Sequence, residues 1–128
     1  MADTEKVSMN MSVVDLGQID LLVEQGYYSG RTDFLRTAVR NQLLTHADMV
    51  KQTVARTAMV LGVLHLSRTA LEKRQAAGER LDVKVVGMLS IDQEVPPELA
   101  LATIASLEVY GVFRASEAVK AAIAPRET

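Results

Sequence analysis

The sequence predicts an α+β protein: a short strand and two helices come first, followed by a small parallel sheet of three strand–helix repeats. Polar and apolar side chains alternate through residues 6–11, as on a strand with one buried face. Apolar side chains then recur at helical spacing through residues 16–43. Three later segments alternate around the glycines at positions 62, 87 and 111. We expect domains at 1–47 and 58–124, joined by a helical linker at 48–57.

Composition limits the classes of function. The chain has 128 residues, no cysteine, and 14 basic against 16 acidic residues. The lack of cysteine excludes disulfides and thiolate metal sites, and no apolar run has the length of a membrane span or the core of a signal peptide. His46 and His65 are the only histidines, and no catalytic or phosphate-loop motif occurs. We therefore expect a cytoplasmic protein that is not an enzyme, uses no cofactor or metal and contacts no membrane.

The predicted strand, residues 6–11, is too short to be stable alone. It places Lys6, Ser8 and Asn10 on one face and apolar side chains on the other. A lone strand must pair with another, and the nearest copy belongs to a second subunit. The polar face then carries three side chains that can hydrogen-bond base edges in a DNA major groove.

Two helices follow the strand. Ser12 and Asp15 fit a capping box at the start of the first helix, and Gly26 is placed to end it. The second helix begins near Gly30 to Thr32, whose unsatisfied amides make a ready site for an anion. A DNA phosphate there would also meet the Ser29 hydroxyl and the Arg31 side chain. Each helix has one apolar stripe, and a single copy cannot bury both, so we expect an obligate two-fold dimer.

Residues 6–43 resemble the ribbon-helix-helix family of DNA-binding proteins. The resemblance runs through residues 7–11 and 19–23 and is most specific over residues 29–40, Ser-Gly-Arg-Thr-Asp-Phe-Leu-Arg-Thr-Ala-Val-Arg. It implies an intertwined homodimer in which two strands form an antiparallel ribbon that enters the major groove of double-stranded DNA. It also implies phosphate contacts at Ser29, Gly30, Arg31 and Thr32. Many relatives carry arginine where this chain has Asn10, so the preferred base sequence stays open.

Net charge argues against strong generic binding to nucleic acid. Residues 1–52 contain five basic side chains against seven acidic ones. Neutralisation of phosphates supplies much of the affinity in most DNA-binding domains. We therefore expect modest, salt-sensitive affinity, and the DNA prediction depends on the motif and not on composition.

The second half contains a repeat. Its three glycines are 25 and 24 positions apart, and each alternating segment ends in serine or aspartate, both good helix N-caps. Helix-like stretches follow at 67–77, 96–104 and 116–123, the first closed by Gly78. Three strand–helix units predict a parallel sheet with right-handed crossovers. An alternative is that residues 116–123, which resemble residues 32–39, belong to a second, degenerate copy of the N-terminal unit.

The leading functional prediction is a dimeric transcriptional regulator, a repressor, that reads a two-fold operator through Lys6, Ser8 and Asn10. Two alternatives stay open: an antitoxin whose C-terminal half covers a toxin, and an interaction or assembly module without a DNA role. For residues 58–124 the exposed sheet edges favour pairing with another copy into a higher oligomer, with effector binding as the second possibility.

Overall fold

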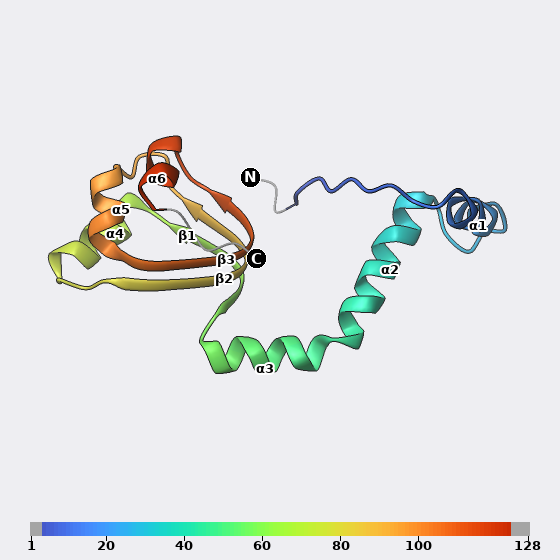
Figure 1. The fold of residues 1–128 in the computed structure, drawn as a ribbon, viewed down its shortest axis with the longest axis horizontal. Helices are drawn as coiled ribbons and strands as arrows, with labels where there is room; N and C mark the ends of the chain where they lie inside the picture. The colour runs from blue at the N-terminus through green and yellow to red at the C-terminus, as the bar shows by residue number, and fades with distance from the viewer. Residues whose placement is uncertain (1–3, 124–128) are drawn as a thin grey trace. The chain divides into compact units, whose positions relative to one another are not determined.

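The computed structural model describes residues 4–123, which form two compact units. One unit contains residues 6–53, and the other contains residues 4–5 and 54–123. The secondary structure is mixed, as the α+β prediction requires (Figure 1). The described elements are, in order, α1 (Val13–Glu24), α2 (Arg31–Thr45), α3 (Ala47–Thr57), β1 (Val60–Leu66), α4 (Arg68–Ala76), β2 (Leu81–Ile91), α5 (Pro97–Thr103), β3 (Ile104–Arg114) and α6 (Glu117–Ala122).

The first unit departs from the prediction at its start. Residues 6–11 carry no strand in the single chain, and the first strand among the described residues begins at Val60. The predicted β-α-α arrangement is therefore not formed within one copy. The physical reason is that a strand exists only through hydrogen bonds to a neighbouring strand, and this segment has none in its own chain.

Local signals place the two helices of this unit well. The Ser12 hydroxyl accepts hydrogen bonds from the amides of Val14 and Asp15, at 3.2 and 3.5 Å, which confirms Ser12 as the N-cap of α1. The reciprocal bond expected from the Asp15 carboxylate is absent from the hydrogen bonds of residues 4–123. Gly26 has a φ of +88°, and its amide and the following one donate to carbonyls in the last turn of α1. This is the left-handed C-terminal motif that the glycine predicts.

The second unit is built on a parallel sheet with strand order β1-β2-β3. Its register aligns Gly62 with Gly87 and Gly87 with Gly111, as the repeat predicts. Each strand is followed by a helix, and Ser67 and Ser116 cap α4 and α6 through their hydroxyls, as predicted. The same prediction is wrong for Asp92, because α5 begins later, with Pro96 as its N-cap. The alternative of a second N-terminal-type unit does not fit, because α6 is the third helix of the repeat and the only described helix after β3.

The glycines bend the three strands at one level. Each has a left-handed φ, between +124° and +137°. A Cβ added to Gly87 would overlap the carbonyl of Gly62, and one added to Gly111 would overlap the carbonyl of Gly87. Only glycine therefore fits at positions 87 and 111, because both the backbone angle and the close approach exclude a side chain.

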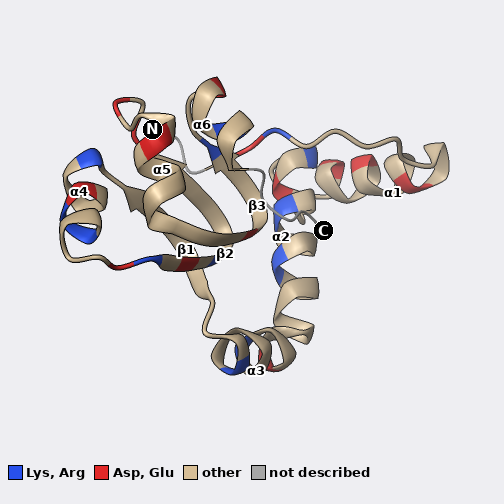
Figure 2. Cartoon of the chain, turned by 60° about the vertical axis from the view of Figure 1, so that its left-hand side comes forward, with Lys and Arg blue, Asp and Glu red and all other residues tan. Residues whose placement is uncertain are grey.

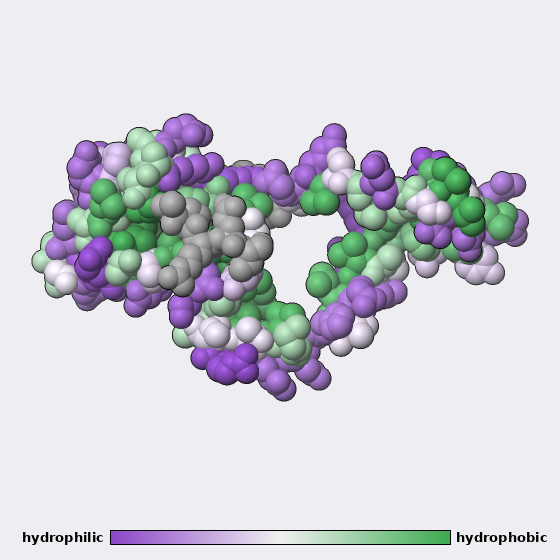
Figure 3. Space-filling model, in the orientation of Figure 1, coloured by the Kyte–Doolittle hydropathy of each residue, from purple (hydrophilic) through white to green (hydrophobic). Residues whose placement is uncertain are grey.

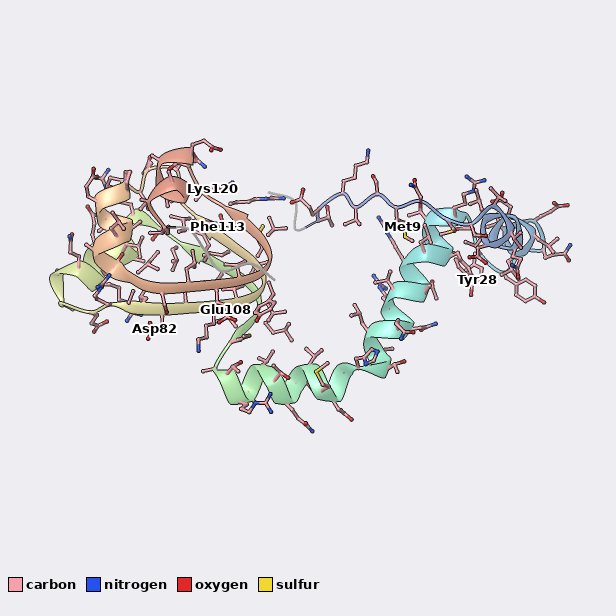
Figure 4. All side chains as sticks on the ribbon, in the orientation of Figure 1. Met9, Tyr28, Asp82, Glu108, Phe113 and Lys120 are labelled. Atoms are coloured by element: carbon pink, nitrogen blue, oxygen red, sulfur yellow. The ribbon has the colours of Figure 1, made fainter. Side chains whose placement is uncertain are left out.

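The core of the second unit lies on one face of the sheet. Helices α4, α5 and α6 pack side by side there. Val85, Leu89 and Ile91 of β2 point into this core, and Phe113 of β3 packs against it (Figure 4). The alternate residues of the strands face the other way. None of α4, α5 and α6 packs on that second face, which we call the open face.

Candidate nucleic-acid interface

The segment from Lys6 to Met11 is open on both sides in the single chain. Lys6, Ser8 and Asn10 are exposed, and none of them makes a hydrogen bond or ion pair with any residue between 4 and 123. Their apolar neighbours are just as open: Val7 is 86% exposed and Met9 is 72% exposed. A polar face in water is ordinary, but an uncovered apolar face is costly. The segment therefore has the alternating side chains of a half-buried strand, but no other part of the chain covers its apolar face.

Two hollows flank this segment. One, of about 450 Å³, lies between it and the helices, with Met9, Ile19, Leu22 and Phe34 among its lining residues. The other, of about 630 Å³, is lined by residues 7–11 together with Leu16 and Leu35. Both are lined mainly by apolar side chains, and Met9 projects from the segment that separates them (Figure 4). Their size and lining suit apolar side chains of another element.

Helices α1 and α2 leave most of their apolar side chains uncovered. Ile19 is the one buried hydrophobic residue of the first unit, where Tyr28 and Phe34 also stack edge to face at 5.0 Å. The predicted stripe of α2 is largely at the surface, with Leu43 61% exposed. Figure 3 shows apolar side chains at the surface over both helices. The exposed large hydrophobic residues of this unit are Val7, Met9, Val13, Val14, Leu21, Tyr27, Leu35, Val39, Leu43, Leu44 and Met49.

The turn before α2 brings together the residues predicted to contact phosphate. Gly30 is the N-cap and gives no side-chain cap, so the first amides of α2 point outward without a partner among the described side chains. The Ser29 amide and hydroxyl both donate to the Asp33 carboxylate, at 2.9 and 3.2 Å. Asp33 thus bonds back from the first turn of the helix to Ser29, the residue before the cap. The sequence prediction missed this role because the two residues are four apart, whereas a capping box links residues three apart.

The Arg31 side chain is engaged by a partner that the sequence did not reveal. Its Nε and Nη2 atoms donate to the two carboxylate oxygens of Asp20, both at 2.8 Å. The hydrogen bonds from Arg31 hold the pKa of Asp20 below its usual range, and the hydrogen bond to Asp20 raises the pKa of Arg31. Asp20 lies eleven residues earlier in a different helix, so no local rule links the two.

Charge is divided between the two helices. α1 carries three acidic residues and no basic one, whereas α2 carries Arg31, Arg36 and Arg40 with a single acid (Figure 2). Arg36 and Arg40 are exposed and make no ion pair with the described residues. Residues 6–53 contain five basic and five acidic side chains, a formal charge of zero. Any positive surface therefore depends on placement along α2 and at Lys6.

Within residues 4–123, none of the helices is long and apolar enough to cross a membrane. No group of three histidine, aspartate or glutamate side chains within residues 4–123 could hold a metal ion.

Comparison with known proteins extends the resemblance. The model of the ribbon-helix-helix transcriptional regulator family matches residues 2–120. The family therefore covers the repeat as well as the N-terminal unit, and the prediction that only the first third belongs to it was too narrow. No curated protein and no solved structure matches the chain. Because the family match spans most of the sequence, the chain belongs to the ribbon-helix-helix transcriptional regulator family.

Proposed function

We propose that this protein is a transcriptional repressor that binds a specific DNA sequence as a homodimer. Residues 1–47 form the DNA-binding and dimerisation domain, residues 48–57 the helical linker, and residues 58–124 a domain for oligomerisation or effector binding. The observation that carries the proposal is that residues 6–43 leave a large apolar surface uncovered in the single chain. Three exposed polar side chains, Lys6, Ser8 and Asn10, alternate with the apolar ones at its start. Membership of a family of transcriptional regulators supports it.

Dimerisation removes the apolar surface from water. Two copies of residues 6–11 pair antiparallel about a two-fold axis, and the helices of each chain fill the hollows beside the other chain's strand. Full burial of one valine, leucine or methionine side chain stabilises by roughly 1.5–3 kcal/mol. This unit has eleven exposed large hydrophobic residues and only one buried one. Burial of the eleven in a dimer would therefore stabilise the unit far more than the single buried residue does in the isolated chain.

The polar face of the ribbon reads the base sequence. Lys6, Ser8 and Asn10 lie on alternate residues, so they share one face once the segment is a strand. The Lys6 ammonium can donate to the O6 and N7 atoms of guanine, and the Asn10 amide can pair with adenine at N6 and N7. Since the dimer is two-fold symmetric, the operator is two-fold symmetric as well.

Phosphate contacts position the ribbon on the duplex. The outward amides at Gly30, Arg31 and Thr32 offer donors to one DNA phosphate in each half of the dimer, and the Ser29 hydroxyl joins them once it leaves Asp33. Because Asp20 holds Arg31 and Asp33 holds Ser29, these contacts depend more on the amides than on side-chain charge. Arg36 and Arg40 supply further positive charge along α2. This balance predicts affinity that depends on sequence more than on generic attraction to DNA.

The higher oligomer predicted for the repeat has a surface that suits it. β1 is an edge strand of the parallel sheet, and it carries no aspartate, glutamate, lysine or arginine. Val60, Leu61 and Val63 are all exposed on it, at 41, 58 and 51%. An apolar edge without lysine, proline or a covering element is a template for pairing with another strand. We propose that dimers associate through β1.

The ribbon assignment is tested by two variants with matched controls. Lys6→Ala and Asn10→Ala should abolish retardation of the cognate duplex while the dimer stays folded, as judged by sedimentation and circular dichroism. Lys73→Ala on α4 and Asn41→Ala on α2 remove the same side chains at exposed positions away from the ribbon, and both should bind normally. Normal retardation by Lys6→Ala and Asn10→Ala would show that the ribbon does not read DNA.

A further inference from the structure

We propose that the open face of the sheet binds a small carboxylate with an apolar body, at a row formed by His65, Ser90 and Arg114. The site lies entirely in the unit of residues 4–5 and 54–123, so binding stands apart from the DNA-binding proposal. Only its consequence for DNA binding, given below, rests on that proposal.

The row is fixed by the sheet register. His65 is paired with Ser90, and Ser90 with Arg114, so the three side chains stand next to one another across β1, β2 and β3. His65 Nδ1 lies 3.2 Å from Ser90 Oγ, and Ser90 is only 4% exposed. The row lies near the carboxyl ends of three parallel strands, where open α/β sheets generally bind ligands. Three hydrogen-bonding side chains thus converge where the strand direction favours a site.

An apolar hollow meets the row at Arg114, the one residue of the row that lines it. It measures about 310 Å³, and its lining includes the glycine bend at Gly62 and Gly87 and the side chains of Val63, Met88 and Val112. Small-molecule sites commonly combine such an apolar lining with a few convergent polar groups. The chemistry suits a ligand with one anionic end and a short hydrocarbon body.

The chain itself places a carboxylate at Arg114. Arg114 Nη2 lies 3.3 Å from Oε2 of Glu5, and it also donates to the Thr4 carbonyl at 3.5 Å. Both residues line the hollow together with Arg114. A carboxylate therefore already occupies the rim of the site. The pair is long, with Arg114 32% and Glu5 56% exposed, and ion pairs of this kind are weak, so a free carboxylate can displace Glu5.

Displacement of Glu5 has a direct consequence for the proposed ribbon. Glu5 is bonded covalently to Lys6, the first residue of the DNA-reading segment. While Glu5 is held at Arg114, the start of that segment is tethered to the sheet. A carboxylate that replaces Glu5 removes the tether and favours ribbon formation. By linkage, DNA binding then favours the carboxylate to the same degree.

Binding is tested on the full-length, ¹⁵N-labelled protein without DNA. The probe is 4-methylpentanoate, and 4-methylpentanamide is the neutral control of the same shape. We expect saturable shifts of the amide resonances of Gly62, Gly87 and Ser90 with the carboxylate and none with the amide. Absence of saturable shifts, or equal shifts with both compounds, would overturn the site.

Two variants separate the roles of the charged residues. Arg114→Gln should weaken binding of 4-methylpentanoate about tenfold, since hydrogen bonds to charged groups contribute on this scale. Glu5→Gln should strengthen it about two- to fivefold, because it removes the internal competitor. Glu98→Gln removes an exposed charge on α5, away from the site, and should leave the affinity for 4-methylpentanoate unchanged. Unaltered affinity in Arg114→Gln overturns the site, and unaltered affinity in Glu5→Gln overturns the competition. A protein that binds the probe but no DNA refutes only the proposed function.

Discussion

Arg31 and Asp20 form a two-point ion pair, with Nε–Oδ1 and Nη2–Oδ2 both at 2.8 Å, that ties the first residue of α2 to the middle of α1. The parallel bonds match the fork of the guanidinium to both carboxylate oxygens. The pair has two effects on the molecule. It fixes how α1 and α2 meet, and it neutralises a cation at the turn where a phosphate contact is proposed.

Asp20→Asn should destabilise the protein at neutral pH and not in strong acid. Because its pKa is lowered in the folded state, Asp20 contributes stability above the ordinary aspartate pKa of about 3.9. That contribution is lost as the pH falls through the lowered folded value. The melting temperatures of the native protein and of Asp20→Asn should therefore differ at pH 7 and converge toward pH 2. A constant difference across this range would contradict the role of the pair.

Gly87→Ala should cost about 3 kcal/mol of stability or prevent folding, because it places a Cβ against the Gly62 carbonyl at a left-handed φ. The matched control is Gly17→Ala in α1, where an added Cβ meets nothing within 4 Å. That change should stabilise by about 0.5–1 kcal/mol through helix propensity. Urea unfolding of both variants measures the contrast. Similar free energies of unfolding for the two variants would refute the glycine bend.

Leu43→Asp should convert the dimer to monomers or unfold the N-terminal unit. Leu43 is exposed on α2 in the single chain, and its burial is proposed to come from the second copy. A carboxylate there would be buried without a partner, which strongly disfavours association. Leu101→Asp on α5 makes the same change at a residue that is 50% exposed and outside this surface. Sedimentation equilibrium should find a dimer or larger species for the control, and an unchanged mass for Leu43→Asp would contradict the interface.

Leu61→Asp should limit the protein to dimers. The proposed association through β1 aligns two apolar edges, and a charge on each edge opposes it. Light scattering at increasing protein concentration should show the native chain passing from dimer to tetramer, whereas Leu61→Asp stays a dimer. A native protein that remains a dimer at every concentration would rule out association through β1.

The sequence predicted best the features that repeat or that act locally. The separation of the three glycines predicted the register of the sheet because each strand pairs with the next so that equivalent residues of successive repeats lie opposite each other. Ser12, Ser67 and Gly26 were assigned correctly because a cap involves only neighbouring residues. The Asp15 return bond failed for a related reason: one hydroxyl suffices to cap α1, and nothing in the sequence requires the second bond.

Long-range partners were beyond the sequence. Asp20 meets Arg31 only after the chain turns between two helices, so no spacing rule finds it. Residues 6–11 have the alternation of a strand, yet they form none and pair with no strand of their own chain. Arg114 and Glu5 lie at opposite ends of the sequence. In all three cases the sequence gives the identity of the residues. Whether they make a contact depends on tertiary or quaternary structure.

The most direct test of the central claim is selection of bound duplexes from a random DNA pool with the purified protein, at low salt and again near physiological salt. A ribbon dimer with Lys6, Ser8 and Asn10 on its reading face should enrich a two-fold symmetric sequence, and the same selection with Asn10→Ala should lose the bases at one position of each half-site. Enrichment of no sequence at either salt concentration would contradict the account.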